Sequence, residues 1–278
     1  MSLQQPAPVH SVAIIGCGWL GIPLTRALIN QGIDVVATRS NSANCSLLQN
    51  QGINAIRLVL NPEVECSQLE ALSKSSIAII LLPPGIRKGS GHEFPEKISN
   101  LAAALKMLGL TRMILASSTS IYPSQNCEVD ETAVIVPDTE SGRILLRAEE
   151  SLMQRTGIQA IVVRLAGLCG PGREPGRLLA GKKDLAGASN PVNLIHQSDA
   201  TDLLVRLIHH QPWGQVFNAC APLHPSRSQL YTHAARAMQL YPPEFNTKTS
   251  PFKQVDGDKI CKQTGFVYRH PNPADWCW

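Results

Sequence analysis

A glycine-rich turn near the start of the chain constrains the fold more than any other feature. The apolar run at 12–15 leads into Gly16, Gly18 and Gly21, and a segment with apolar residues at helical spacing follows. A second apolar run occupies 35–38. The order is strand, glycine turn, helix and strand, the unit in which a G-x-G-x-x-G turn holds a pyrophosphate at a helix N-terminus. We therefore predict a dinucleotide-binding Rossmann domain.

The three glycines are expected to have separate mechanical roles. The first permits a tight turn, the second lets the pyrophosphate approach the backbone, and the third lets helix and strand pack closely. Cys17, inside the turn, is expected to be a small packing residue rather than a reactive thiol. The predicted cofactor-binding residues are Gly16, Cys17, Gly18, Trp19, Leu20, Gly21, Arg39, Ser40, Pro83 and Pro84.

The end of the second strand distinguishes NADP from NAD. A NAD site usually has Asp or Glu there to bind the ribose hydroxyls. This chain instead has Thr38, Arg39, Ser40 and Asn41. A guanidinium at Arg39 would pair with the 2′-phosphate of NADP, so the sequence favours NADP, with NAD as the second choice. The alternative is a solvated surface arginine.

Strands and helices continue to alternate along the chain. This alternation implies an α/β fold with a doubly wound parallel sheet, helices on both faces and ligands at the carboxyl edge. Strands are predicted at 55–60, 77–82, 113–116 and 160–165, and helices at 42–50, 67–73, 96–108 and 142–156. The loops expected at the ligand edge are 16–21, 83–87, 117–122 and 166–173.

The chain is expected to have two functional parts. Residues 1–165 form the dinucleotide-binding Rossmann domain, and residues 166–278 complete the sheet and form a smaller substrate-binding portion. The Gly- and Pro-rich segment 167–193 is either a substrate-side loop or a surface excursion. Later elements are a strand and helix within 193–208, the helix capped by Ser198 or Asp199, a strand at 215–219 and a helix at 226–240; the tail at 242–278 has no assignable pattern.

Composition limits the compartment and the partners. A net charge of +4 without a long basic run gives no support to a nucleic-acid or membrane surface. No apolar segment reaches the roughly 20 residues of a membrane span. The 8 cysteines form no CxxC pair, and the N-terminus lacks an apolar signal region, which indicates reduced thiols in the cytoplasm. The 8 histidines show no HxxxH or HExxH spacing, so no metal site is predicted.

Five motifs, in order along the chain, resemble those of the short-chain dehydrogenase/reductase superfamily, in its extended and atypical branch of NAD-dependent epimerase/dehydratase-like proteins. They are GCGWLG at 16–21, SSTSIY at 117–122, SGRILLRAE at 141–149, RLAGLCGPGR at 164–173 and NLIHQSDATDLL at 193–204. The resemblance implies an NAD(P)-binding oxidoreductase or epimerase with a small-molecule substrate. It also implies a homodimer in which the helices at 96–108 and 142–156 pair with their copies.

The resemblance also assigns candidate catalytic residues. Ser118 matches the residue that hydrogen-bonds the reacting substrate oxygen, and Ser120 matches a nearby substrate-contacting hydroxyl. Tyr122 lies in the same loop and is a candidate acid, although its counterpart is commonly structural. The family's YxxxK motif falls on Ser141 in place of the tyrosine and Leu145 in place of the lysine. A serine hydroxyl is far too weak an acid to replace a phenol of lowered pKa, so the standard proton relay is missing.

Two classes of function stay open on this basis. The first is an enzyme in which Ser118 orients the substrate and another group or water moves the proton. The second is a non-catalytic NADP-binding redox sensor or regulatory protein. His196 matches a family histidine expected to fix its loop.

Overall fold

The computed structural model describes residues 7–66, 69–85, 89 and 91–276. The chain forms two compact units whose segments alternate along the sequence. The first consists of Met1–Ser118, Thr139–Val163 and Thr201–Val216, and the second of Thr119–Asp138, Arg164–Ala200 and Phe217–Trp278. The sequence divides the chain at residue 165 by function, into a cofactor-binding part and a substrate-binding part. The two compact units do not test that functional division, which stays a prediction.

The central sheet has seven strands in the order β12-β9-β7-β6-β1-β2-β3. β1 pairs in parallel with β2 and β6, β2 with β3, and β6 with β7, which confirms the predicted doubly wound fold. The strand order reverses beside β1, so the glycine turn that follows β1 lies at the topological switch point, where such folds bind ligands. The strands are β1 Ser11–Ile15, β2 Asp34–Arg39, β3 Ala55–Arg57, β6 Ile77–Ile80, β7 Arg112–Ser118, β9 Gln159–Leu165 and β12 Val216–Ala219.

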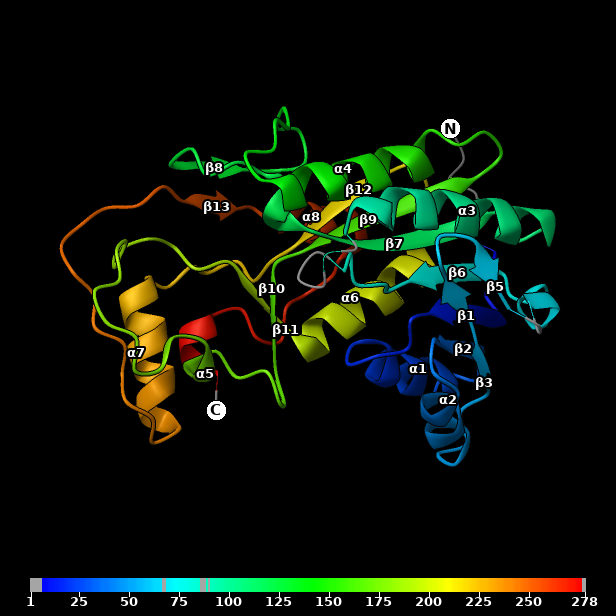
Figure 1. The fold of residues 1–278 in the computed structure, drawn as a ribbon, viewed down its shortest axis with the longest axis horizontal. Coiled ribbons are helices and arrows are strands. Elements are labelled where there is room, and N and C mark those ends of the chain that lie inside the picture. Colours follow the sequence, from blue (N-terminus) through cyan, green and yellow to red (C-terminus); the bar gives the residue numbers. More distant parts are fainter. Residues whose placement is uncertain (1–6, 67–68, 86–88, 90, 277–278) are drawn as a thin grey trace. The chain divides into compact units, whose positions relative to one another are not determined.

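The helices of the first unit follow the apolar spacing of the sequence. α3 and α4 lie side by side on one face of the sheet, and α1 lies on the other (Figure 1). α3 buries Phe94, Ile98, Leu101, Ala102 and Leu105 on its inner face, as its helical period predicts. The bounds are α1 Gly21–Ile29, α2 Ser42–Gln49, α3 Phe94–Met107 and α4 Glu140–Met153, with a short 3-10 turn η3 at Gly91–Glu93. α6, at Gln197–His210, has its first turn in the second unit and the rest in the first.

The strand predicted at 55–60 is wrong as a single element. β3 ends at Arg57, and β4 Val59–Leu60 instead forms an antiparallel hairpin with β5 Val64–Glu65. The Asn61-Pro62 pair reverses the chain between the two strands, and this turn signal outweighs the continuous apolar run. The short helix predicted at 67–73 corresponds to η1 Leu69–Leu72, and positions 67 and 68 lie outside the described residues.

The second unit is built from shorter elements. β10 Gly167–Cys169 pairs in parallel with β11 Leu194–His196, and β8 Cys127–Val129 pairs in parallel with β13 Lys253–Val255. Ser226 and Gln229 form a capping box that starts α7. The remaining elements are η4 Thr119–Ile121, α5 Gly176–Leu179, α7 Arg227–Ala237, α8 Asp258–Thr264 and η5 Pro273–Asp275.

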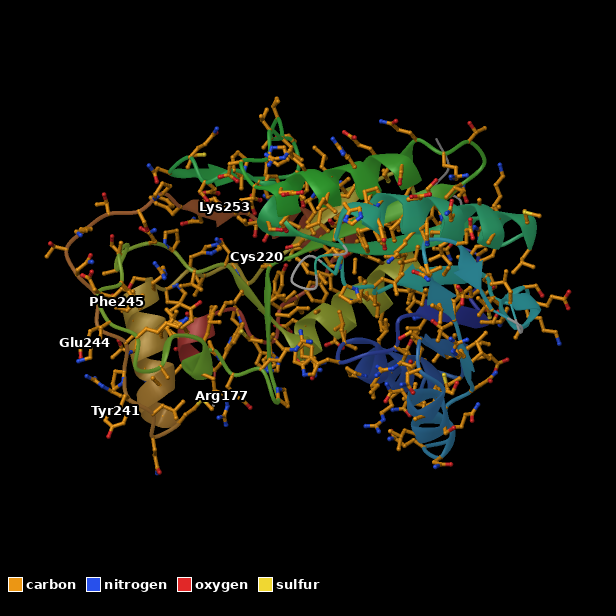
Figure 2. The ribbon with its side chains drawn as sticks, in the orientation of Figure 1. Arg177, Cys220, Tyr241, Glu244, Phe245 and Lys253 are labelled. Carbon is orange, nitrogen blue, oxygen red and sulfur yellow. The ribbon has the colours of Figure 1, made fainter. Side chains whose placement is uncertain are left out.

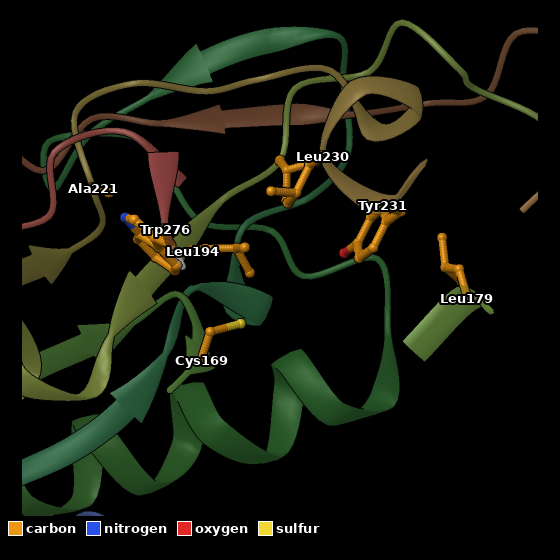
Figure 3. Packing of buried hydrophobic residues seen from close by; sticks show 8 residues of the cluster. Cys169, Leu179, Leu194, Ala221, Leu230, Tyr231 and Trp276 are labelled. Carbon is orange, nitrogen blue, oxygen red and sulfur yellow. The ribbon is translucent and has the colours of Figure 1, made fainter. Parts of the chain in front are cut away.

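An apolar cluster holds this unit together (Figure 3). Trp276, from the tail, belongs to this cluster together with Leu194 of β11 and with Leu230 and Tyr231 of α7. The other buried members are Cys169, Leu179, Val192 and Ala221. The tail that shows no periodicity in the sequence therefore contributes a large aromatic side chain to the core of the second unit. Within the described part of the chain, no helix has both the length and the apolar character needed to cross a membrane.

Candidate functional site

Hydrogen bonds to Thr38, near the end of β2, hold the glycine turn in place. The Gly16 N–H donates to Thr38 Oγ1 at 3.0 Å, and the Cys17 N–H donates to the Thr38 carbonyl at 2.8 Å. The Gly18 N–H donates back to the Gly16 carbonyl at 2.7 Å, which closes the turn just before α1. Thr38 therefore fixes the turn through both its side chain and its backbone.

Two of the three glycines lie where a Cβ would be crowded, and Gly16 also has a positive φ. Gly16 has φ +88°, and a Cβ there would lie 3.0 Å from Leu82 Cδ2 and 3.1 Å from the Leu81 carbonyl oxygen. A Cβ on Gly21 would lie 3.3 Å from the Gly16 carbonyl oxygen and 3.4 Å from Ile14 Cγ2. The first glycine thus permits the turn and the third lets α1 pack on β1, as the motif predicts.

Arg39 reaches back from the end of β2 to the glycine turn. Its Nη1 donates to the Cys17 carbonyl at 2.7 Å, and a Cβ on Gly18 would lie 3.5 Å from the same nitrogen. The guanidinium is half-buried and held beside the turn, unlike the solvated surface arginine considered as its alternative. This places a positive charge at the start of α1, whose first-turn N–H groups carry partial positive charge of their own.

The other predicted cofactor residues surround this turn with different exposures. Cys17 is fully buried, its Sγ lies 3.5 Å from Thr25 Oγ1, and burial raises the pKa of its thiol, so it is a packing residue. Leu20 is buried, Trp19 and Pro84 are half-buried, and Ser40 and Pro83 are exposed. Of the loop predicted at 83–87, positions 86 and 87 lie outside the described residues.

A buried carboxylate fixes α4 against β7 in the first unit. Ser117, near the end of β7, donates its hydroxyl to Glu149 Oε1, and both side chains are buried. Ser141, Leu145 and Glu149 are spaced by four residues and so share one face of α4. Leu145 is 4% exposed, which places an apolar side chain one turn before the buried glutamate.

The loop after β7 carries the candidate catalytic hydroxyls. Ser118 is the last residue of β7 and Ser120 lies in η4, both half-buried. Tyr122 is fully buried; its hydroxyl donates to Asn218 Oδ1 at 2.9 Å and accepts from Arg164 Nη1 at 2.8 Å. Burial raises the pKa of the Tyr122 phenol, with Arg164 acting in the opposite direction.

The prediction that Ser198 or Asp199 caps α6 is wrong, because the helix begins before both residues, at Gln197. The Asp199 side chain is 1% exposed and accepts two tail N–H groups, from Arg269 at 2.9 Å and from His270 at 3.0 Å. α6 begins at Gln197, which puts Asp199 inside the first turn, where its carboxylate binds the returning chain instead of the helix N-terminus. Sequence spacing cannot distinguish these two acceptor roles because the tail is about 70 residues away.

His196 fixes its surroundings through aromatic stacking. Its ring stacks on His270 with centroids 4.0 Å apart, and Trp276 meets it edge-on at 5.4 Å. The Ser198 hydroxyl lies 2.7 Å from His196 Nδ1 and 3.2 Å from His270 Nδ1. Burial, followed by the neighbouring His270, lowers the pKa of His196.

Acid is expected to weaken the second unit through His196. Because the pKa of His196 in the folded chain lies below its ordinary value of about 6.5, the unfolded chain binds more protons between the two values. The free energy of unfolding should therefore fall as the pH drops below about 6.5, more steeply in wild type than in His196→Gln. Urea unfolding between pH 8 and pH 5 measures this. His270, Asp199 and Arg269 face this position in both proteins, so the difference between wild type and variant reports the His196 ring. A wild type that gains stability on acidification relative to the variant would contradict the prediction.

Some residues near the candidate hydroxyls carry no signal in the sequence. Lys253 of β13 donates its ammonium to the Tyr122 carbonyl, and Asn218 of β12 binds the Tyr122 hydroxyl. Arg164, which also binds the Tyr122 hydroxyl, could have been noticed in the sequence, because it is a charged residue within the apolar strand 160–165. Among the described residues, no group of three His, Cys, Asp or Glu side chains is arranged to hold a metal ion.

Comparison with known proteins gives a relative over nearly the whole chain. No family model matches the chain. Protein YeeZ of Escherichia coli is 36% identical over 270 residues, which cover 95% of this chain and 98% of YeeZ.

Solved structures share the fold at lower identity. UDP-glucose 4-epimerase from Thermotoga maritima, solved with UDP-glucose, has a TM-score of 0.77 at 14% identity, covering 95% of this chain and 96% of its own. UDP-glucuronic acid 4-epimerase from Bacillus cereus, solved with UDP-glucuronic acid and NAD, has a TM-score of 0.75 at 17% identity, with 93% and 94% covered. A functionally unknown conserved protein from Silicibacter pomeroyi has a TM-score of 0.74 at 23% identity, with 95% of each chain covered. At these identities the likeness is one of fold.

Proposed function

Because this chain belongs to the same family as Protein YeeZ of Escherichia coli and has the fold of the short-chain dehydrogenase/reductase superfamily, we propose that it is a nicotinamide-dinucleotide-binding oxidoreductase or epimerase-like protein acting on a small molecule. The observation that carries the proposal is the Gly16 to Gly21 turn, which the Thr38 side chain and backbone hold at the switch point of the sheet. We further propose a cytoplasmic location, on the cysteine pattern alone.

The residues of the turn fit a dinucleotide. The positive φ of Gly16 favours glycine, a Cβ on Gly21 would be crowded, and α1 begins at Gly21 with first-turn N–H groups that favour an anion. When bound, the nicotinamide would accept or donate a hydride. The chain's own task is then to orient the substrate and to move the proton, and Ser118 and Ser120 are the hydroxyls we assign to orientation.

The 2′-phosphate of NADP is the group we propose that Arg39 recognises. Its guanidinium already lies beside the turn, with Nη1 2.7 Å from the Cys17 carbonyl. The Arg39→Ala change is expected to weaken NADPH binding by about 1.5–3 kcal/mol, the scale of a hydrogen bond to a charged group. NADH binding should change little. Titration calorimetry with both cofactors on wild type and variant measures the difference.

Arg26→Ala is the matched control for that measurement. Arg26 is an exposed arginine of α1 whose Nη2 donates to Gln51 Oε1 at 2.9 Å, on the same unit as the turn. Its loss should leave both affinities unchanged. Equal losses for NADPH and NADH in Arg39→Ala would show that Arg39 supports the turn through Cys17 without reading the phosphate.

A non-catalytic redox sensor is the second candidate function. The observation that favours it is the apolar Leu145, buried on the α4 face that it shares with Ser141 and Glu149. With the family's YxxxK motif placed on residues 141–145, Ser141 stands at the position of the tyrosine of the proton relay and Leu145 at the position of its lysine. A thermal-shift screen of small carbonyl compounds and nucleotide sugars with NADPH present separates the two functions, because a true substrate adds stability with its concentration.

A homodimer through α3 and α4 is proposed as the assembly. The two helices lie side by side (Figure 1), and Met107 at the end of α3 is 89% exposed although it is apolar. An isologous interface would cover such a side chain. We expect light scattering at micromolar concentration to give a dimer mass, and Met107→Glu to shift the mass toward that of the monomer. A monomer mass for wild type would remove this proposal.

A further inference from the structure

Lys253 comes from the part of the tail that has no pattern in the sequence, yet it reaches the loop of the candidate catalytic hydroxyls. It is the first residue of β13, which pairs in parallel with β8, and Figure 2 labels it there. Its Nζ donates to the Tyr122 carbonyl. Tyr122 follows directly on η4, the turn that carries Ser120.

The backbone of Lys253 is fixed from two sides. Asn193 Nδ2 donates to the Lys253 carbonyl at 2.8 Å, and the Val255 N–H donates to Asn193 Oδ1 at 2.8 Å. On the other side, the Asn126 N–H donates to the Phe252 carbonyl at 2.8 Å. Lys253 is therefore a half-buried side chain on a held strand, in contrast to a lysine on a surface loop.

Tyr122 is in turn held at its far end. Its hydroxyl lies between Arg164 Nη1 at 2.8 Å and Asn218 Oδ1 at 2.9 Å, and the Arg164 guanidinium carbon lies 5.2 Å from the ring centroid. With Lys253 on its carbonyl, both ends of this buried residue are bonded. The chain before Tyr122 can then move little, and Ser120 is two residues away.

The contact also brings a charge to a loop of hydroxyls. Burial lowers the pKa of the Lys253 ammonium, and the Asp138 carboxylate opposes that shift. Asp138 Oδ2 accepts from the Ser124 N–H at 3.0 Å, two residues after Tyr122. A lysine and an aspartate thus hold the turn at 122–124 between them.

We propose that Lys253 is the positioning residue of the 119–122 loop, that it fixes the Ser120 hydroxyl through the carbonyl of Tyr122, and that Tyr122 is the buried anchor of this loop. The inference rests on the proposed function for the meaning of Ser120, but the contact itself does not depend on cofactor binding. It assigns an ammonium group that binds the backbone of this loop to the tail of the chain, whereas Leu145 occupies the helix position where the resemblance places the family lysine.

Hydrogen exchange measured by mass spectrometry on the full chain tests the inference. The peptide covering 117–126 is compared in wild type, Lys253→Met, Lys253→Arg and Gln254→Ala. Lys253→Met removes the donor at similar size and should lower protection about tenfold or more, the scale of a hydrogen bond from a charged group. Lys253→Arg should restore most of the protection. Gln254→Ala, on the same strand with an exposed contact to Glu128, should leave it unchanged.

A pH profile separates positioning by the charge from simple packing. Protection of the same peptide, corrected for intrinsic exchange, should fall in wild type as the pH rises toward 10.5, the ordinary lysine pKa, because burial lowers the pKa of this ammonium, and it should stay flat in Lys253→Arg. Asp138 and the Tyr122 carbonyl face the Lys253 side chain in both proteins, Cys127 is its cross-strand neighbour on β8, and Glu128 pairs with Gln254. Wild-type protection in Lys253→Met, no rescue by arginine, or the same pH dependence in Lys253→Arg would each overturn the proposal. NADPH titration of Lys253→Met, expected to match wild type, keeps this result separate from the proposed function.

Discussion

Replacing Asp199 by alanine is expected to lower the free energy of unfolding by about 3 kcal/mol. The carboxylate is 1% exposed and accepts the N–H groups of Arg269 and His270, so its loss leaves two half-buried donors without a charged acceptor. Each such bond contributes about 1.5–3 kcal/mol, and water reaching the freed groups recovers part of the loss. Differential scanning calorimetry should show a Tm lower by roughly 6–12 °C.

Two further variants decide whether this loss comes from the carboxylate. Asp199→Asn keeps the size and one acceptor oxygen, so about half of the loss is expected. Asp258→Ala removes an exposed carboxylate of the same unit, paired with Lys262 at 3.5 Å, and should change stability by less than about 1 kcal/mol. Wild-type stability in Asp199→Ala would mean that the tail is held by Trp276 and the apolar cluster alone.

The first unit is largely predictable from the sequence because its elements are long and its signals are local. The glycine turn, the two strands around it and α3 all follow from apolar period and from stop residues such as Gly109. The strand predicted at 55–60 fails where two signals compete, since the apolar run continues up to the Asn61-Pro62 turn. Local patterns therefore predict the glycine turn and the position of Arg39 at the end of β2.

The second unit is poorly predictable because its contacts join distant segments. β13 has three residues, too few for a periodic signal, and exists through its pairing with β8 and the Asn193 side chain. Asp199 has the residue type and position of a helix cap, yet its partners are two N–H groups about 70 residues further on. Lys253 and Asn218 reach the candidate site in the same way, so the resemblance to a family motif gives no indication of them.

Slow turnover on ordinary ketone and sugar-nucleotide substrates is expected even where the cofactor binds well. With the family's YxxxK motif placed on residues 141–145, Ser141 replaces the phenol and Leu145, which is 4% exposed, replaces the ammonium. General acid catalysis typically contributes about 10²–10⁴-fold, and this is the factor expected to be missing. Tyr122 does not restore it, because the phenol is fully buried, bonded to Asn218 and Arg164, and raised in pKa by burial.

NADPH oxidation against a broad carbonyl panel measures this in wild type, Ser118→Ala and Tyr122→Phe. Wild-type rates should be low, Ser118→Ala should lower them further by removing the hydrogen bond to the substrate oxygen, and Tyr122→Phe should change Tm far more than kcat. Rapid turnover abolished by Tyr122→Phe would contradict this expectation and identify Tyr122 as the acid. Slow turnover that neither change affects would instead favour the redox-sensor function, because a hydroxyl that orients a substrate cannot be removed without changing its reaction.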